Sequence, residues 1–303
     1  MAEQRVTVQV GARRLRLSNL DKQLYPGFSK ARVIDYYTRI APVLLPHLAG
    51  RPVTFIRFPE GGTGPSFFEK DVSRHAPDWL PTAALPSSGS RGNGEIIHYP
   101  LLTDLPALVW AANLAALELH VPQWTLRRDG TRGAPDRLVF DLDPGPGTSI
   151  VECCRIAERL REILLADGLT PVAKTSGSKG LQLYCGVRTR TPERTSAYAK
   201  ALAEQLAQET PQLVTAKMAK ALRGGRVLID WSQNNPAKTT VAPYSLRGRA
   251  RPTVSTPVTW AEVQGCRHAE DLVFTADEVL DRVAEAGDLF ADLAATRAAL
   301  PAR

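Results

Sequence analysis

Three acidic residues inside apolar segments are the side chains of this sequence best suited to chemistry. In RLVFDLDP (137–144), Asp141 and Asp143 alternate with apolar residues. Both carboxylates therefore project from one face of a predicted strand, roughly 6.5–7 Å apart along it. Asp230 repeats this setting in RVLIDWS (226–232). Carboxylates grouped at the edge of a core repel one another unless a cation neutralises them, and oxygen ligands suit Mn²⁺ or Mg²⁺.

Three acids of this kind fit phosphoryl transfer by two metal ions. One ion activates an attacking 3′-hydroxyl, and the other holds a triphosphate and stabilises the leaving pyrophosphate. The plainer alternative is a strand end followed by an acidic turn, which the DxD spacing alone does not exclude. The second apolar-flanked acid, Asp230, favours the metal site.

Small and basic residues in three loops could bind phosphate. TSGSKG (175–180) combines glycines, Ser176 and Lys179, although it lacks the spacing of a Walker A loop. Arg223 precedes the Asp230 strand, and Arg247 follows it. Guanidinium groups bind phosphate oxygens bidentately, so these arginines suit a triphosphate. A Ser/Gly turn and two surface arginines remain the alternative interpretation.

His120 and the cysteines give no metal-ligand pattern. His120 lies in ELHVPQW, where a lone histidine is more often a core or surface residue than a ligand. The cysteines form no CxxC pair, which argues against a zinc site and a disulfide framework. We therefore expect a protein of the reducing cytoplasm, associated with the nucleoid if it binds DNA.

Composition indicates a globular protein with a polyanionic partner. The chain has 303 residues, is 44% hydrophobic and 23% charged, and carries a net charge of +7. No apolar run reaches the ~20 residues that span a bilayer, and we find no signal peptide, so no membrane partner is expected. A solvated basic surface would also explain the charge, but clustering of the basic residues favours nucleic acid. The clusters are Arg13, Arg14 and Arg16; Lys217, Lys220, Arg223 and Arg226; and Arg247, Arg249 and Arg251.

The expected elements mix helices and strands without a regular βαβ rhythm, which predicts an α+β fold. Helices are expected at 30–48, 104–118, 149–166 and 192–209, and through most of the chain after 257. Ser29 is expected to cap the first of these helices, and Thr148 the third. Strands are expected at 137–144, 171–175, 181–187 and 226–232, and loops at 59–70 and 86–95.

Several motifs, in order along nearly the whole chain, closely resemble the polymerase domain of bacterial ligase D, in the archaeo-eukaryotic primase superfamily. They are NLDKQLYP (19–26), GPSFFEK (64–70), ALELHVPQW (116–124), RLVFDLDPGPG (137–147), KTSGSKGL (174–181), VLIDWSQN (227–234) and TTVAPYSLRGR (239–249). The resemblance implies a primase-type catalytic core with an N-terminal module, and an active site between them. We expect one domain over 1–303, with this module at about 1–110 and the catalytic module at 111–303.

The resemblance also implies template-directed nucleotide addition with two Mn²⁺ or Mg²⁺ ions and a preference for ribonucleotides. Asp141, Asp143 and Asp230 match the metal ligands. Family positions that contact the incoming nucleotide are matched by His120, Ser176, Lys179, Arg223, Arg247, Phe67 and Phe68. The two phenylalanines would stack on bases, although from the residues alone they could equally be core.

The DNA contacts implied by the resemblance lie nearer the N-terminus. Asn19, Lys22 and Lys30 match a pocket for the 5′-phosphate of gapped or broken DNA, and the helix beginning near Ser29 would add its dipole. Arg57 and Lys70 are expected to contact the template strand.

Two positions depart from the family pattern. Ile56 replaces the lysine of a Lys-Arg pair, and Gln182 replaces a histidine. These departures and the initial Met favour a stand-alone homologue over an excised domain. It would act in end joining, with a DNA ligase or a DNA-end-binding protein, or in filling gaps during excision repair. The competing hypothesis is a non-catalytic module that binds DNA ends and recruits a ligase.

Overall fold

Alternating apolar residues build the largest sheet of the protein. The structure is a computed structural model, which describes residues 5–87 and 94–301. Its middle strand, β12 (Arg137–Pro144), pairs antiparallel with β16 (Val227–Asp230) and with β14 (Leu181–Arg188). The strand order is β15-β16-β12-β14-β13-β18, and β19 pairs parallel with β14. The outer strands are β15 (Val214–Thr215), β13 (Pro171–Thr175), β18 (Pro257–Val258) and β19 (Arg297–Ala299).

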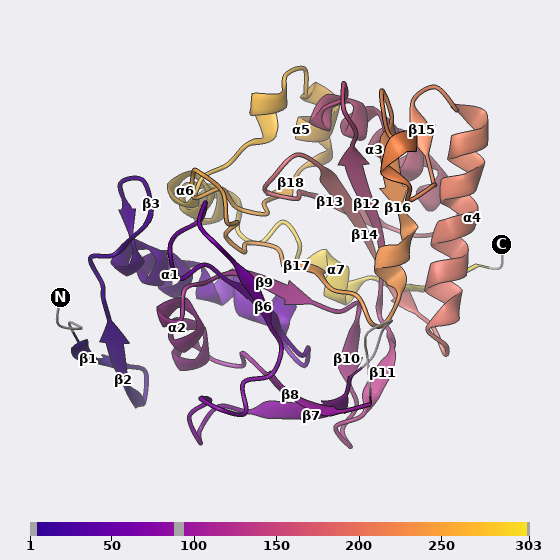
Figure 1. The fold of residues 1–303 in the computed structure, drawn as a ribbon. Helices are drawn as coiled ribbons and strands as arrows, with labels where there is room; N and C mark the ends of the chain where they lie inside the picture. Colours follow the sequence, from indigo (N-terminus) through magenta and orange to yellow (C-terminus); the bar gives the residue numbers. More distant parts are fainter. Residues whose placement is uncertain (1–4, 88–93, 302–303) are drawn as a thin grey trace.

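The two faces of this sheet differ. Leu138, Phe140 and Leu142 pack into a core with α3 (Ile150–Ala166) and α4 (Glu193–Glu209), which lie beside the sheet in Figure 1. Val139, on the other face, packs with Tyr184, Phe290 and Leu293. Because side chains alternate along a strand, Asp141 and Asp143 share the face of Val139, away from these two helices.

A second sheet, ordered β17-β9-β5-β6, supplies the other side of the site. It contains β17 (Thr240–Val241), β9 (Ala116–Val121), β5 (Thr54–Arg57) and β6 (Phe67–Glu69). It shares a core with α1 (Lys30–Leu48) and α2 (Leu105–Asn113), and Tyr37 Oη donates to Leu117 O at 2.7 Å. The predicted division of the chain into two modules near residue 110 stays a prediction. Both β9 and β17 follow residue 110 in the chain, yet they belong to the same sheet as β5 and β6.

Hairpins and short helices make up the remaining regular structure. The hairpins are β1 (Arg5–Val10) with β2 (Arg13–Ser18), β3 (Gln23–Tyr25) with β4 (Phe28–Ser29), β7 (Thr82–Pro86) with β8 (Ile96–Pro100), and β10 (Trp124–Leu126) with β11 (Arg132–Pro135). The helices are η1 (Lys220–Leu222), η2 (Trp231–Asn234), α5 (Trp260–Gly265), η3 (Ala269–Leu272), α6 (Ala276–Ala286) and α7 (Asp292–Ala295). Over the described residues, we find no helix long and apolar enough to cross a membrane.

The predicted helix 104–118 is wrong in its second half. Asp104 caps α2 by accepting from the Ala107 N–H, but the helix ends at Asn113 and Ala115 adopts φ +56°. The chain then turns into β9, where pairing with β5 and β17 outweighs the helical preference of its residues. This turn places His120 on a sheet. Most of the predicted loop 86–95 lies outside the described residues.

Three predicted helix and strand ends also differ. Ser149, not Thr148, caps α3, in a capping box with Glu152. Ser29 occupies the N-cap position of α1 without a side-chain cap, because the first helical N–H groups donate instead to backbone carbonyls of residues 20 and 22. The strand predicted at 226–232 stops at Asp230, because its carboxylate accepts from the Ser232 N–H and starts η2.

Candidate active site

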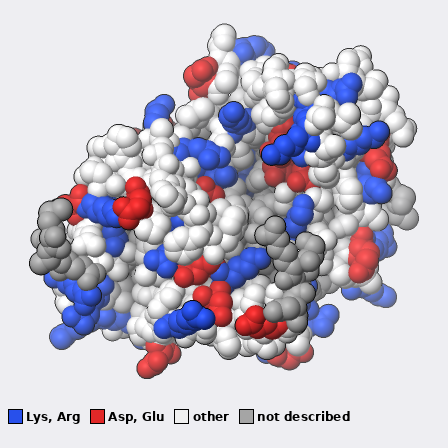
Figure 2. Space-filling view, in the orientation of Figure 1, with Lys and Arg blue, Asp and Glu red and all other residues white. Residues whose placement is uncertain are grey.

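The two neighbouring acids of β12 line a cavity of about 410 Å³ between the two sheets. Asp141 stands directly opposite Asp230 in the β12–β16 ladder, so adjacent strands bring the three predicted acids to one end of the sheet. Figure 2 shows Lys and Arg side chains beside acidic ones around the hollow at the centre of this face. The strand register therefore brings together the three acids, which sequence spacing alone could not place relative to one another.

Burial and like charge act together on these carboxyl groups. Burial raises the pKa of Asp141, and the nearby Asp143 and Asp230 raise it further, while the hydrogen bond from Gln182 lowers it. The pKa of Asp143 is also raised, by burial first and then by Asp230, against the opposing charges of Arg223 and Arg247. Partly desolvated, mutually repelling carboxylates of this kind favour a bound cation.

Asp230 is held differently from the other two acids. Its Oδ1 accepts from the Ser232 N–H at 3.0 Å and from the Ser232 hydroxyl at 2.5 Å, and its Oδ2 accepts from Gln233 Nε2 at 2.8 Å. Asp230 is not among the residues that line the cavity. Across the described part of the chain, no group of three or more His, Cys, Asp or Glu side chains is arranged to hold a metal ion.

The donor chemistry nevertheless fits a hard divalent cation at Asp141 and Asp143. Both offer carboxylate oxygens, both face the cavity, and the pKa of each is raised by burial and then by a neighbouring carboxylate, Asp143 for Asp141 and Asp230 for Asp143. Asp230 is close enough to raise the pKa of Asp143, but both of its carboxylate oxygens accept hydrogen bonds from residues of η2. The site therefore offers two placed ligands, with a third one strand away.

The loop after β13 forms one wall of the cavity. Ser176 Oγ accepts from the Gly180 N–H at 3.0 Å, and Ser176 O accepts from Arg247 Nη1 at 2.6 Å. Gly177 has φ +68°, and a Cβ there would lie 2.7 Å from both Arg247 Cγ and Ser255 N. Only glycine permits this close approach, which fixes the loop against the predicted phosphate-binding arginine.

Glu118 links two of the predicted nucleotide-binding residues. Its Oε2 lies 2.8 Å from His120 Nε2, its Oε1 lies 3.1 Å from Arg247 Nε, and Oε1 also accepts from the Gly248 N–H at 3.0 Å. Burial alone would raise the pKa of Glu118, but these partners hold it at about 2. Burial lowers the pKa of His120, against the opposing effect of its hydrogen bond to the Glu118 carboxylate. A buried anion therefore orients both side chains.

Three further cations border the cavity. Arg223 donates to Met218 O at 2.6 Å, and its buried Nε has no hydrogen-bond partner among the residues that the structure describes. Arg249 donates to Ser178 Oγ at 2.8 and 3.1 Å. Lys179 is exposed on the loop. Together with His120 and Arg247, these cations could neutralise a bound triphosphate.

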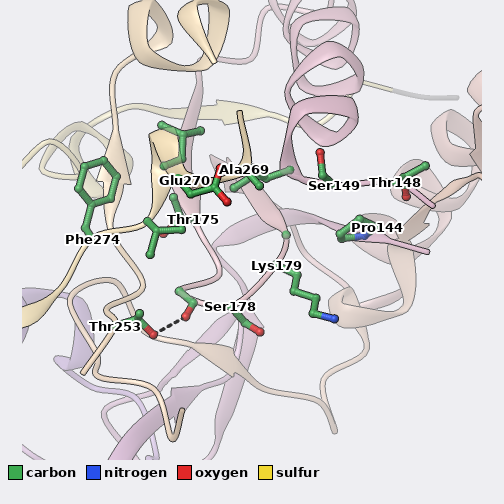
Figure 3. Close-up of a pocket in the computed structure, with 15 residues that line it drawn as sticks. Pro144, Thr148, Ser149, Thr175, Ser178, Lys179, Thr253, Ala269, Glu270 and Phe274 are labelled. Carbon is green, nitrogen blue, oxygen red and sulfur yellow. Dashed lines mark hydrogen bonds between the residues drawn. The ribbon is translucent and has the colours of Figure 1, made fainter. Parts of the chain in front are cut away.

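A second cavity of about 290 Å³ lies behind the same loop (Figure 3). Ser178 and Lys179 border both cavities, so the loop is the wall between them. On this side Thr253 Oγ1 donates to Gly177 O at 2.7 Å, which ties the loop to the segment after Arg247. Phe274 forms part of the far wall.

The predicted base-stacking and template residues lie outside the cavity lining. Phe67 and Phe68 on β6 are 45% and 67% exposed, which excludes the alternative that they are core residues. Arg57 donates to Glu69 at 3.1 Å, and its guanidinium lies 5.2 Å from the Phe67 ring. Lys70 borders a small separate cavity beside Trp124.

The three predicted 5′-phosphate residues come together at the start of α1. The Lys22 N–H donates to Asn19 O at 3.1 Å, and the Lys30 N–H donates to Lys22 O at 2.8 Å. The Lys22 ammonium pairs with Glu60 at 3.0 Å, and the buried Lys30 Nζ lies 3.4 Å from Ser18 Oγ. Two helix N–H groups that would have contributed to the predicted dipole site donate to backbone carbonyls instead.

Sequence reasoning missed Glu118, Gln233 and Arg249 as members of the site. It also missed Lys174, whose ammonium donates to Gln182, the hydrogen-bond partner of Asp141. Glu118 and Lys174 are buried charges within apolar strands, the same signal that identified Asp141, and could have been found by it. The only sequence signal at Arg249 is its place in a basic cluster. Gln233 carries no such signal, because its role depends on the short helix that follows Asp230.

Comparison with known proteins gives a consistent result. Residues 29–290 match the family described as LigD, primase-polymerase domain. The chain is 47% identical over 285 residues to the multifunctional non-homologous end joining protein LigD of Mycolicibacterium smegmatis, covering 92% of this chain and 36% of that protein. It is 33% identical over 283 residues to the bifunctional non-homologous end joining protein LigD of Bacillus subtilis, covering 92% of this chain and 44% of that protein.

A solved structure extends this likeness to the fold. The polymerase domain of Mycobacterium tuberculosis ligase D in complex with DNA is 43% identical and superposes with a TM-score of 0.86. The alignment covers 93% of this chain and 98% of that domain. The predicted α+β fold of the primase-polymerase type is confirmed, whereas the chain spans less than half the length of the relatives above.

Proposed function

The chain belongs to the LigD primase-polymerase domain family, a family of nucleotidyltransferases. We propose that it extends DNA 3′ ends at short gaps or breaks by template-directed addition of nucleotides, and that it prefers ribonucleotides. The observation that supports this most is the composition of the 410 Å³ cavity. Two carboxylates lie at one side of it, and the cations Arg223 and Arg247 and the ring of His120 border it. This is the charge pattern that a metal-bound triphosphate requires.

In this proposal each cluster of the cavity has its own task. Asp141 and Asp143 hold divalent ions, Mn²⁺ or Mg²⁺, with Asp230 as the third acid. When bound, such ions activate the attacking hydroxyl and stabilise the leaving pyrophosphate. The Ser176–Gly180 loop, Lys179, Arg223 and Arg247 bind the triphosphate, and Glu118 keeps His120 and Arg247 turned toward it.

The DNA contacts come from the other half of the molecule. Asn19, Lys22 and Lys30 would bind the 5′-phosphate across a gap, because their backbones are already hydrogen-bonded into one cluster. Phe67 and Phe68 would stack on bases, since both rings are exposed. Arg57 and Lys70 would contact the template. The protein would act with a DNA ligase or an end-binding protein at the nucleoid, in end joining or excision repair.

Extension of a primer across a gapped duplex tests this function. Asp141→Asn removes one charge at nearly constant shape and should reduce nucleotide addition by about 10³-fold or more, by analogy with the loss of other essential catalytic groups. Asp281→Asn, the same charge change at an exposed residue of α6 outside the cavity, is the matched control and should extend normally. Full extension by Asp141→Asn would refute the assignment of the metal site.

The same assay separates the proposed enzyme from the recruitment module. Binding to gapped DNA is measured beside extension, with ribo- and deoxyribonucleotides in Mn²⁺ and in Mg²⁺. A recruitment module would bind the gap tightly and add no nucleotide with either ion. The half-buried, repelling pair Asp141 and Asp143 argues against it, because carboxylates facing DNA phosphates weaken binding unless a cation intervenes.

A further inference from the structure

The hairpin β1–β2 carries a basic surface that the proposed function does not use. No acidic residue occurs between Arg5 and Leu20. Arg14 and Arg16 on β2 are exposed and alternate with the buried Leu15 and Leu17. In the part of the chain that the structure describes, no carboxylate pairs with either arginine. Figure 2 shows Lys and Arg gathered over this hairpin, on the same face as the central hollow.

The hairpin is held rigidly by its inner face. Leu15 and Leu17 belong to the core shared with α1 and α2. The Arg13 guanidinium lies 4.7 Å from the Trp79 ring centroid, and the Ser18 N–H donates to Asn113 Oδ1 at 3.0 Å. The outer face therefore presents Arg14 and Arg16 from fixed backbone positions, beside their cross-strand partners Gln9 and Thr7.

The outer face leads directly to the predicted 5′-phosphate residues. β2 ends at Ser18, the next residue is Asn19, and Ser18 Oγ lies 3.4 Å from Lys30 Nζ. In Figure 1 the hairpin lies at the left edge of the molecule, and β12 lies in the opposite half. DNA that runs from the cavity past Asn19 would therefore reach the hairpin only beyond its 5′-phosphate.

We propose that the outer face of β1–β2 binds the backbone of the DNA duplex downstream of the gap, with Arg14 and Arg16 as its phosphate contacts. This inference rests on the proposed function. Side chains two residues apart on a strand are separated by about 6.8 Å. Phosphates of one DNA strand advance ~3.4 Å per nucleotide along the helix axis, and because the backbone also winds around that axis, neighbouring phosphates lie farther apart in space than this rise. The two arginines therefore match neighbouring phosphates. We favour duplex DNA over an acidic protein as the partner of this surface, because the hairpin lies next to the predicted 5′-phosphate residues, on the side away from the cavity.

The test compares gapped DNA substrates that share a 5′-phosphate and differ in the downstream duplex, about 5 or about 20 base pairs, which is roughly half a turn or two turns. The wild type should bind the long arm more tightly. Arg14→Gln/Arg16→Gln should lose about tenfold in affinity for the long arm and little for the short one. Its slope of log affinity against log salt should fall by about 2, since each phosphate contact contributes about 0.9.

The matched control is Arg188→Gln/Arg190→Gln, the same charge change at exposed residues with the same spacing, at the end of β14. The control should keep both the arm-length effect and the salt slope. The proposal is overturned if the hairpin variant keeps the full gain from the long arm, or if the control loses as much.

Failure of the underlying function is recognised separately. On a primer–template without a downstream strand, the hairpin has no duplex to contact, and the Arg14/Arg16 variant should add nucleotides at the wild-type rate. If the wild type adds none on this substrate, the polymerase proposal fails, whereas the arm-length comparison still decides whether the hairpin binds duplex DNA.

Discussion

Gln182 Nε2 donates a hydrogen bond to Asp141 Oδ1 at 2.9 Å, across the β12–β14 ladder. The Oε1 of the same amide accepts from Lys174 Nζ at 2.6 Å and from Tyr184 Oη at 3.1 Å. Both partners of Oε1 act as donors here, so the amide can present only its NH₂ group to Asp141. Gln182 therefore orients the first proposed metal ligand.

From this relationship, we predict that Gln182→Leu weakens Mn²⁺ binding by about tenfold, at the lower end of the effect of removing an outer-shell partner. The measurement is a titration of the protein with Mn²⁺, in which free Mn²⁺ is followed by electron paramagnetic resonance without DNA or nucleotide. Gln182→His keeps an N–H donor and should retain most of the affinity. Equal affinities for the wild type and Gln182→Leu would rule out the orienting role.

Glu118→Gln should raise the KM for the nucleotide about tenfold and change kcat less. The amide keeps a contact with His120 but no longer attracts Arg247, and charge-assisted contacts are about twice as strong as neutral ones. Steady-state extension at varied nucleotide concentration measures the split. A fall in kcat at unchanged KM would contradict the positioning of triphosphate-binding side chains.

The same carboxylate predicts an effect of pH on stability. Its pKa is about 2 in the folded protein against 4.5 ordinarily, so its contribution is present above about pH 4.5 and is lost as the pH falls toward 2. Denaturant unfolding between pH 5 and pH 2.5 should show a steeper loss for the wild type than for Glu118→Gln. Parallel curves would show that Glu118 contributes no such linkage.

His120 should take up a proton when a triphosphate binds. Burial lowers its pKa in the free protein, so the ring is neutral near pH 7, and a polyanion in the cavity favours the charged form. Nucleotide affinity should therefore rise as the pH falls from 8 to 6. Calorimetry without metal, in two buffers that differ in ionisation enthalpy, should detect up to about one proton per nucleotide. His120→Asn should abolish the uptake, and buffer-independent heats for the wild type would exclude it.

Glu60→Gln should strengthen the preference for gaps that carry a 5′-phosphate, by a few-fold at most. Lys22 pairs with Glu60 at 3.0 Å, and a phosphate must displace this exposed carboxylate, whose pair contributes only about 0–1 kcal/mol. Lys22→Ala should change the preference in the opposite direction and spare nucleotide addition. Binding to matched gaps with and without the phosphate measures both variants. Equal losses by Lys22→Ala on the two substrates would contradict a phosphate contact.

The sequence by itself determined the strands that carry the three acids. Period-two alternation identified 137–144 and the acids on its second face, and apolar flanks singled out Asp230. The ends of 171–175 were also predicted correctly. These features are local, because the alternation of side chains along a strand depends only on its own residues.

Tertiary structure alone decided how those acids are arranged and which residues support them. The register that sets Asp141 opposite Asp230, and the contacts that join Glu118 to Arg247, connect strands distant in sequence. The same cause ended α2 at Asn113, because the residues after it pair with β5 and β17. Strand register and long-range contacts depend on which surfaces pack together, and the local periodicity of the sequence does not determine that packing.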